Sequence, residues 1–99
     1  MDIDRPAPAR SLTRSHPGDR TSAGIHHTLA RPWPYVLAAI DGAWRHGVVG
    51  GWSQARPGGP VIVYVEWSDG RSGRADNVIH DPDLMIPGEQ DIWGPRPPR

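Results

Sequence analysis

The chain has 99 residues, 12 of them Gly and 12 Pro, and this length suits one small domain. It carries 11 basic and 11 acidic residues, for a formal net charge of zero, and it contains no cysteine. The length excludes a large enzyme with a deep cleft, and the absence of cysteine excludes disulfides and thiolate metal sites. The chain also lacks the excess of basic residues that is usual in a dedicated nucleic-acid binder. No apolar run approaches the roughly 18 residues of a membrane helix, so we expect no membrane partner.

Residues 1–32 are predicted to form a flexible arm rich in Arg and Pro. Prolines interrupt any helix longer than a few turns, although the spacing of Ile25 and Leu29 allows a short helix over residues 22–30. Residues 1–20 contain no apolar segment of a secretory signal, so we expect a cytoplasmic protein. Every basic residue is Arg, and Ala, Gly and Pro are frequent, which is typical of a high-GC bacterial genome.

Apolar residues concentrate in the predicted core domain, residues 33–87. Its first strand is expected at 35–40, followed by an Asp41-Gly42 turn. Residues 43–52 form the next strand, where three glycines favour a sharp bend or a bulge. Simple alternation would place Trp44, His46, Val48, Gly50 and Trp52 on one face of that strand.

The clearest strand is Val61–Trp67, which follows a Pro/Gly-rich loop. Its valines and Trp67 are expected to point inward, whereas Ile62, Tyr64 and Glu66 point toward solvent. An Asp69-Gly70 hairpin turn leads into a short polar return strand over 71–76. Residues 84–86 close the core, and residues 88–99 form a Pro-rich tail predicted to be disordered, as is the arm.

These strands carry a family pattern. The spacing Trp44-x-x-Gly47-x-Val49 precedes a loop and then Val63-x-Val65-x-Trp67-x-Asp69-Gly70. This pattern resembles the SH3-like small barrels of the Tudor, Agenet and chromo-barrel kind, over about residues 35–86. The resemblance implies an all-β, open barrel of four or five strands, in which the small residue lets two strands cross closely. Tudor-type barrels build cages from aromatic residues, which here would come from Trp44, Trp52, Tyr64 and Trp67.

The aromatic residues allow two interpretations. A small barrel needs large side chains to fill its core, and this favours core positions for Trp44 and Trp67. Aromatic side chains also form pockets for cations or proline-rich peptides. We expect Tyr64 and Trp52 at a binding face with Arg71, because aromatic residues and Arg are frequent interface hot spots. Trp44, Arg45 and Arg74 are further binding candidates. The last two could form a basic stripe with Arg71, although the acidic residues between them favour an ordinary, self-neutralising surface.

Catalytic and metal sites are not expected. The five histidines show no spacing typical of metal ligands, and the serines lack the G-x-S-x-G turn of a nucleophile. We therefore expect no enzyme activity and no cofactor. The segment Pro95–Arg99 has the composition of a polyproline ligand.

The sequence predicts a non-catalytic binding module that recognises a peptide or another protein. The alternative is a nucleic-acid-associated accessory protein that uses the Arg-rich arm and the face formed by Arg45, Arg71 and Arg74. Salt distinguishes the two, because phosphate binding weakens steeply as salt rises.

Overall fold

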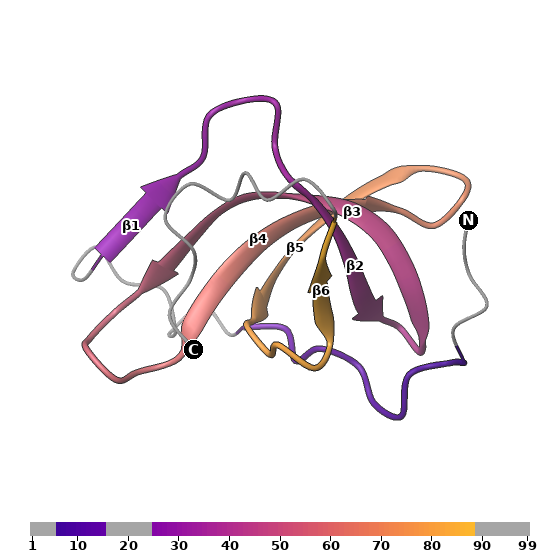
Figure 1. Ribbon diagram of the computed structural model, residues 1–99, viewed down its shortest axis with the longest axis horizontal. Helices are drawn as coiled ribbons and strands as arrows, with labels where there is room; N and C mark the ends of the chain where they lie inside the picture. The colour runs from indigo at the N-terminus through magenta and orange to yellow at the C-terminus, as the bar shows by residue number, and fades with distance from the viewer. Residues whose placement is uncertain (1–5, 16–24, 89–99) are drawn as a thin grey trace.

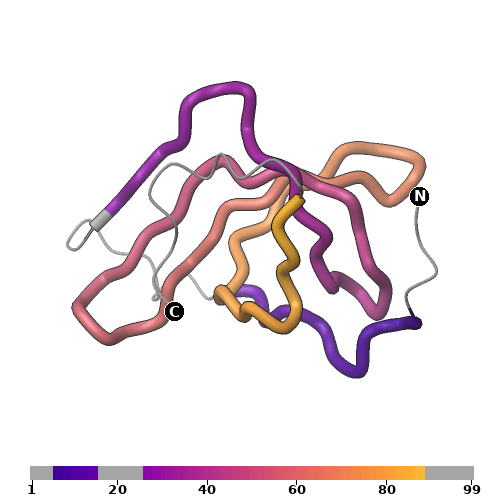
Figure 2. Tube along the Cα trace, in the orientation of Figure 1, coloured from indigo at the N-terminus to yellow at the C-terminus, as the bar shows by residue number. Residues whose placement is uncertain are grey.

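The computed structural model describes residues 6–15 and 25–88 (Figures 1 and 2). In these ranges all regular structure is β-strand, which confirms the predicted all-β class. The strands are β1 (Ile25–Thr28), β2 (Tyr35–Ile40), β3 (Ala43–Gln54), β4 (Val61–Ser68), β5 (Gly73–Ile79) and β6 (Met85–Pro87). The described residues thus form six strands rather than four or five. They include no helix that is long and apolar enough to cross a membrane.

All strands pair antiparallel in one sheet, in the order β5-β4-β3-β2-β6. The long strand β3 curves through the molecule (Figure 1). Its first half pairs with β2 and its last four residues pair with β1. One strand can serve both neighbours because it is twice the length of β2, with 12 residues against six.

The bulge that the glycines predict lies in β3, where the register with β4 shifts between Val49 and Gly51. Before the shift Val49 pairs with Val65, and after it Trp52 pairs with Val63. Paired residues share a face, so Trp52 lies on the side of the valines. The expectation that Trp52 shares a face with Trp44 is therefore wrong, because the extra residue reverses the alternation.

Both predicted turns are present. Asp41 and Gly42 have positive φ angles of 53° and 80°, as a two-residue hairpin turn requires. In the β4–β5 turn, an Asp69 Oδ1 accepts hydrogen bonds from the backbone N–H groups of Arg71 (2.8 Å) and Ser72 (3.0 Å). Gly70 adopts φ 93° in the same turn. Local backbone chemistry is sufficient to specify these turns.

The core lies on the face of β4 that carries Val63 and Val65, both completely buried. It also contains buried side chains from every other strand except β1, together with Leu12 and Leu29. The opposite face is more covered than predicted, because Ile62 is only 2% exposed. Ile62 shares a hollow with residues of β1 and with Trp33, so the segment predicted to be a free arm contributes to this side of the sheet.

Residues 6–15 correct the prediction of an arm without stable contacts. Leu12 is 7% exposed within the core cluster, and its N–H donates to the Ala39 carbonyl at 2.8 Å. The Ile79 N–H donates to the Thr13 carbonyl, also at 2.8 Å, at the free edge of β5. These residues run along the lower edge of Figure 2, where they satisfy strand-edge groups that would otherwise need water.

Residues 25–28 correct the predicted helix, because they pair with β3 as strand β1. A Cβ on Gly51 would stand only 2.5 Å from the carbonyl oxygen of His27 in β1. The glycine therefore allows the two backbones to approach, which the i, i+4 spacing in the sequence could not reveal. The remaining parts of the predicted arm and tail, residues 1–5, 16–24 and 89–99, lie outside the described residues.

We expect Leu12→Ala to lower the free energy of unfolding by about 2 kcal/mol, since it removes a buried side chain from the core. Thr13→Ala is the matched control. The Thr13 side chain is exposed, and the substitution keeps the Thr13 carbonyl that accepts from the Ile79 N–H. Urea denaturation of both variants measures the effect. Equal, small losses for the two would show that residues 6–15 do not contribute to the core.

Candidate functional site

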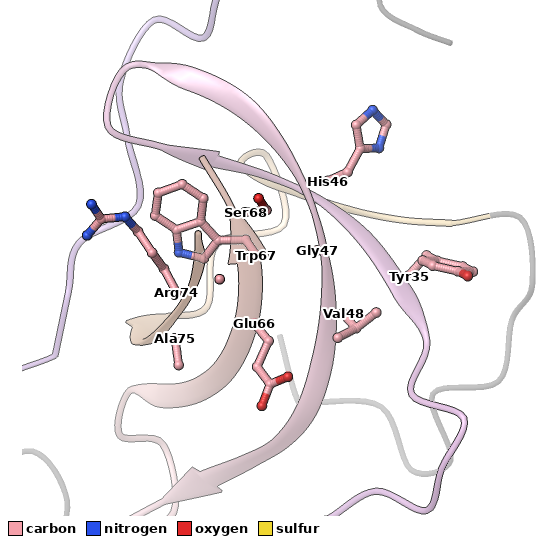
Figure 3. A pocket seen from close by; sticks show the side chains of 10 residues that line it. Tyr35, His46, Gly47, Val48, Glu66, Trp67, Ser68, Arg74 and Ala75 are labelled. Carbon is pink, nitrogen blue, oxygen red and sulfur yellow. The ribbon is translucent and has the colours of Figure 1, made fainter. Parts of the chain in front are cut away.

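Three strands bring three side chains together on the face opposite the core valines. Tyr35 of β2 pairs with Val48 of β3, and Val48 pairs with Glu66 of β4. These three residues line two hollows of about 580 and 570 Å³, and Figure 3 shows the first from close by. The second hollow also includes Arg31 and Trp33. Because they share these residues, the two hollows form one continuous depression across the sheet.

A third, smaller hollow of about 240 Å³ continues this depression past Trp33 to Tyr64 and Trp52. We call the whole depression the aromatic groove. Its defining residues are Arg31, Trp33, Tyr35, Val48, Tyr64 and Glu66.

Trp33 and Tyr64 pack against each other in the groove. Their rings meet edge to face, with centroids 6.0 Å apart and an interplanar angle of 87°. The Trp33 indole N–H donates to the Leu29 carbonyl at 3.0 Å, which fixes the ring. A Cβ on Gly50 would lie 2.8 Å from Tyr64 Cδ2 and 2.9 Å from Trp33 Cη2. The bulge glycine therefore makes room for both rings.

Two arginines and one carboxylate line the groove, namely Arg31, Arg74 and Glu66. The guanidinium carbon of Arg31 lies 4.3 Å from the ring centroid of Trp33, a cation–π contact. The Tyr64 hydroxyl donates to a Glu66 carboxylate oxygen at 2.8 Å. This hydrogen bond, followed by burial, raises the pKa of Tyr64, so the phenol stays protonated and holds the carboxylate in place. Such a surface can bind apolar rings beside a charged group.

Of the predicted binding residues, Tyr64 and Trp52 line the same hollow. Arg71 is exposed in the β4–β5 turn and does not line the described hollows of the groove. The indole of Trp44 donates to the Pro6 carbonyl at 2.8 Å and packs against the core. It thus lies near residues 6–10, in a different hollow of about 380 Å³.

Arg45 and Arg74 flank one buried ring instead of forming a free basic stripe. Their guanidinium carbons lie 5.2 and 5.9 Å from the ring centroid of Trp67, which is 5% exposed. Arg74 also pairs with Asp69 at 2.9 Å, and Arg45 donates to the Ile40 carbonyl at 3.1 Å. Trp67 is therefore a core residue, and the two arginines pack over it.

Arg14 connects the N-terminal segment to the sheet through two carboxylates. Its guanidinium pairs with Asp76 at 2.8 Å and with Asp41 at 3.1 Å. Burial alone would raise the pKa of Asp76, but hydrogen bonds from Arg14 and the Trp67 indole outweigh it and lower that pKa. The Arg10 guanidinium likewise lowers the pKa of Asp81.

Acid is expected to destabilise the protein. The pKa values of Asp69, Asp76 and Asp81 are lowered in the folded state, so the unfolded chain binds more protons below its carboxyl pKa of about 3.9. Stability should therefore be retained from pH 7 to about 5 and fall as pH drops below about 4. Thermal melts across this range measure the change in stability.

Arg14→Gln should lower the free energy of unfolding by about 1 kcal/mol at pH 7 and reduce the loss of stability in acid. If the stability of the variant and that of the unsubstituted protein changed with pH in parallel, Arg14 would not be lowering the pKa of Asp76.

Trp33, Tyr35 and Arg31 line the groove but are not among the binding residues predicted from the sequence. Tyr35 begins a predicted strand, whereas Trp33 and Arg31 lie at or before the predicted domain boundary. The signal that could have found them is a Trp between two prolines, directly before a strand that starts with Tyr. Only the cross-strand register brings them next to Glu66.

The described residues contain no group of three or more His, Asp or Glu side chains that could hold a metal ion. No protein-family model, curated protein or solved structure matches this chain.

Proposed function

We propose that this protein is a non-catalytic binding module that recognises a peptide or protein partner in the aromatic groove. The observation that carries the proposal is the exposure of Tyr35. Among the described residues it is the large apolar side chain left exposed, at 63%, and it lines both of the larger hollows of the groove. Exposed aromatic residues beside charged groups are typical of interface hot spots.

The shape of the groove favours an extended ligand. It crosses three neighbouring strands instead of forming one enclosed cavity, and its residues include both Arg31 and Glu66. A peptide can place apolar side chains on the rings and polar groups beside the charges. We keep an SH3-like barrel of the Tudor kind as the proposed fold family, and the strand order β6-β2-β3-β4-β5 is compatible with it.

The nucleic-acid alternative finds less support. It relied on arginines of the arm and of the sheet face, but Arg10 and Arg14 pair with carboxylates. Arg45 and Arg74 pack on Trp67. These contacts compete with phosphate binding, whereas Arg71, the third arginine of that face, is exposed. Non-specific binding needs several free cations along a nucleic-acid backbone.

Selection of a displayed peptide library on the full chain tests the proposal. We expect peptides that bind with an affinity reduced about tenfold or more by Tyr35→Ala, the loss typical of a hot spot. The thermal melting temperature should not change, because the Tyr35 side chain is mostly exposed. Arg56→Ala is the matched control, since Arg56 is exposed in the β3–β4 loop and does not line the groove's described hollows.

Two results would contradict the proposal. One is that no selected peptide depends on Tyr35. The other is that random-sequence duplex DNA or single-stranded RNA binds, with an affinity that falls steeply as salt rises. The second result would favour the nucleic-acid alternative.

A further inference from the structure

The chain leaves the described fold at one edge of the aromatic groove. Strand β6 ends at Pro87, which pairs with Val36 next to Tyr35. The following N–H, that of Gly88, donates to the Tyr35 carbonyl at 2.9 Å. A Cβ on Gly88 would lie 3.0 Å from the Tyr35 Cβ. Gly88, the last described residue, therefore lies beside the most exposed ring of the groove.

The sequence after Gly88 has the chemistry that the groove would bind. It contains Trp93 and then Pro95-Arg96-Pro97-Pro98-Arg99. In a polyproline II conformation, residues three apart lie on the same edge. Pro95 and Pro98 then share one edge and the two arginines share the next. Aromatic-lined grooves bind such proline edges, and a carboxylate beside the rings suits the arginine edge. Glu66 is such a carboxylate, held by Tyr64.

The length of the segment is sufficient for it to reach along the groove. At about 3.1 Å per residue, residues 89–99 span roughly 34 Å in an extended polyproline conformation. The groove crosses β2, β3 and β4, and neighbouring strands lie about 5 Å apart, so its extent across the sheet is well within this reach. A short tether also gives an effective concentration of about 1 mM. A site with an intrinsic dissociation constant of about 100 µM would then be roughly nine-tenths occupied by its own tail.

We propose that residues 89–99 bind along the aromatic groove of the same molecule, with Pro95 and Pro98 against its rings and Arg96 toward Glu66. The proposal uses the groove of the proposed function and names a ligand that the chain itself carries. An external peptide would have to displace this segment. The groove would therefore select partners that bind more tightly than the tethered tail.

Paramagnetic NMR tests the proposal on the full chain. The sequence has no cysteine, so a single cysteine appended after Arg99 carries one nitroxide label. We expect the label to broaden the amide signals at the far end of the groove, around Gly51 and Trp52, and to leave those of Leu12 and Asp76 sharp. Pro95→Ala/Pro98→Ala in the labelled chain should abolish the broadening. Gln90→Ala, which keeps every Pro and Arg, should preserve it.

Three outcomes would overturn the proposal. The first is no selective broadening of groove signals, and the second is broadening at another surface. The third comes from a mixture in which one chain carries the isotope and no nitroxide, and the other carries the nitroxide. Broadening in this mixture equal to that within the labelled chain would assign the contact to a second copy. None of these results affects the peptide-library test, because a selected peptide could still depend on Tyr35. Conversely, groove broadening without any selected peptide would reject the proposed function alone.

Discussion

Val65→Asp is expected to unfold the protein. Val65 lies in the middle of β4, is completely buried, and pairs with Val49 on one side and Asp76 on the other. A carboxylate at this position would be buried, and the nearby Asp76 would repel it. The cost of burying an unpaired charge exceeds the roughly 5 kcal/mol that a small domain can lose. Circular dichroism and the dispersion of amide NMR signals at 25 °C measure the loss of fold.

Ser68→Asp is the matched control, because Ser68 ends the same strand and is exposed. Its hydroxyl accepts from the Gly70 N–H at 3.1 Å, and an Asp carboxylate can accept that hydrogen bond as well. Ile62→Asp should be nearly as damaging as Val65→Asp, because Ile62 is also buried. A folded, cooperative Ile62→Asp variant would show that this side of β4 faces solvent after all.

Gly47→Ala is expected to destabilise the protein by about 3 kcal/mol or more. A Cβ at this position would stand 2.7 Å from the Glu66 carbonyl oxygen and 3.2 Å from Val65 Cγ1. The first contact is with backbone, so rotation of a side chain cannot relieve it. Strands β3 and β4 would have to separate at this point. Urea denaturation measures the change in the free energy of unfolding.

Gly73→Ala is the control for Gly47→Ala. Gly73 begins β5, has no atom within 4 Å of the position of a Cβ, and does not have a positive φ. Its replacement should change stability by no more than about 0.5 kcal/mol. Similar losses for the two variants would mean that the cost comes from glycine itself and not from the close approach of the strands.

Part of the candidate site could be predicted from the sequence. Tyr64 was expected to point away from the valines, and it does line the groove on the opposite face. That inference needed only the two-residue period of a strand. Trp52 was expected at the binding face because it is an aromatic residue at the end of a strand. It lines the smallest hollow of the groove, but the bulge places it on the side of the valines, where it packs against the core. Arg71 followed from composition alone, and the groove's described hollows do not include it.

The sequence by itself determined strands β2, β3 and β4 and the two Asp-Gly turns, but it did not indicate strand β1. Period-two alternation defined β4, and Asp-Gly pairs defined two turns, because these signals depend on neighbouring residues. Only the tertiary structure decided which faces are covered and which side chains meet. Leu12 is buried because a distant segment returns to the edge of the sheet. Tyr35, Val48 and Glu66 form one surface because antiparallel register aligns residues from three strands, and register depends on pairing between distant segments.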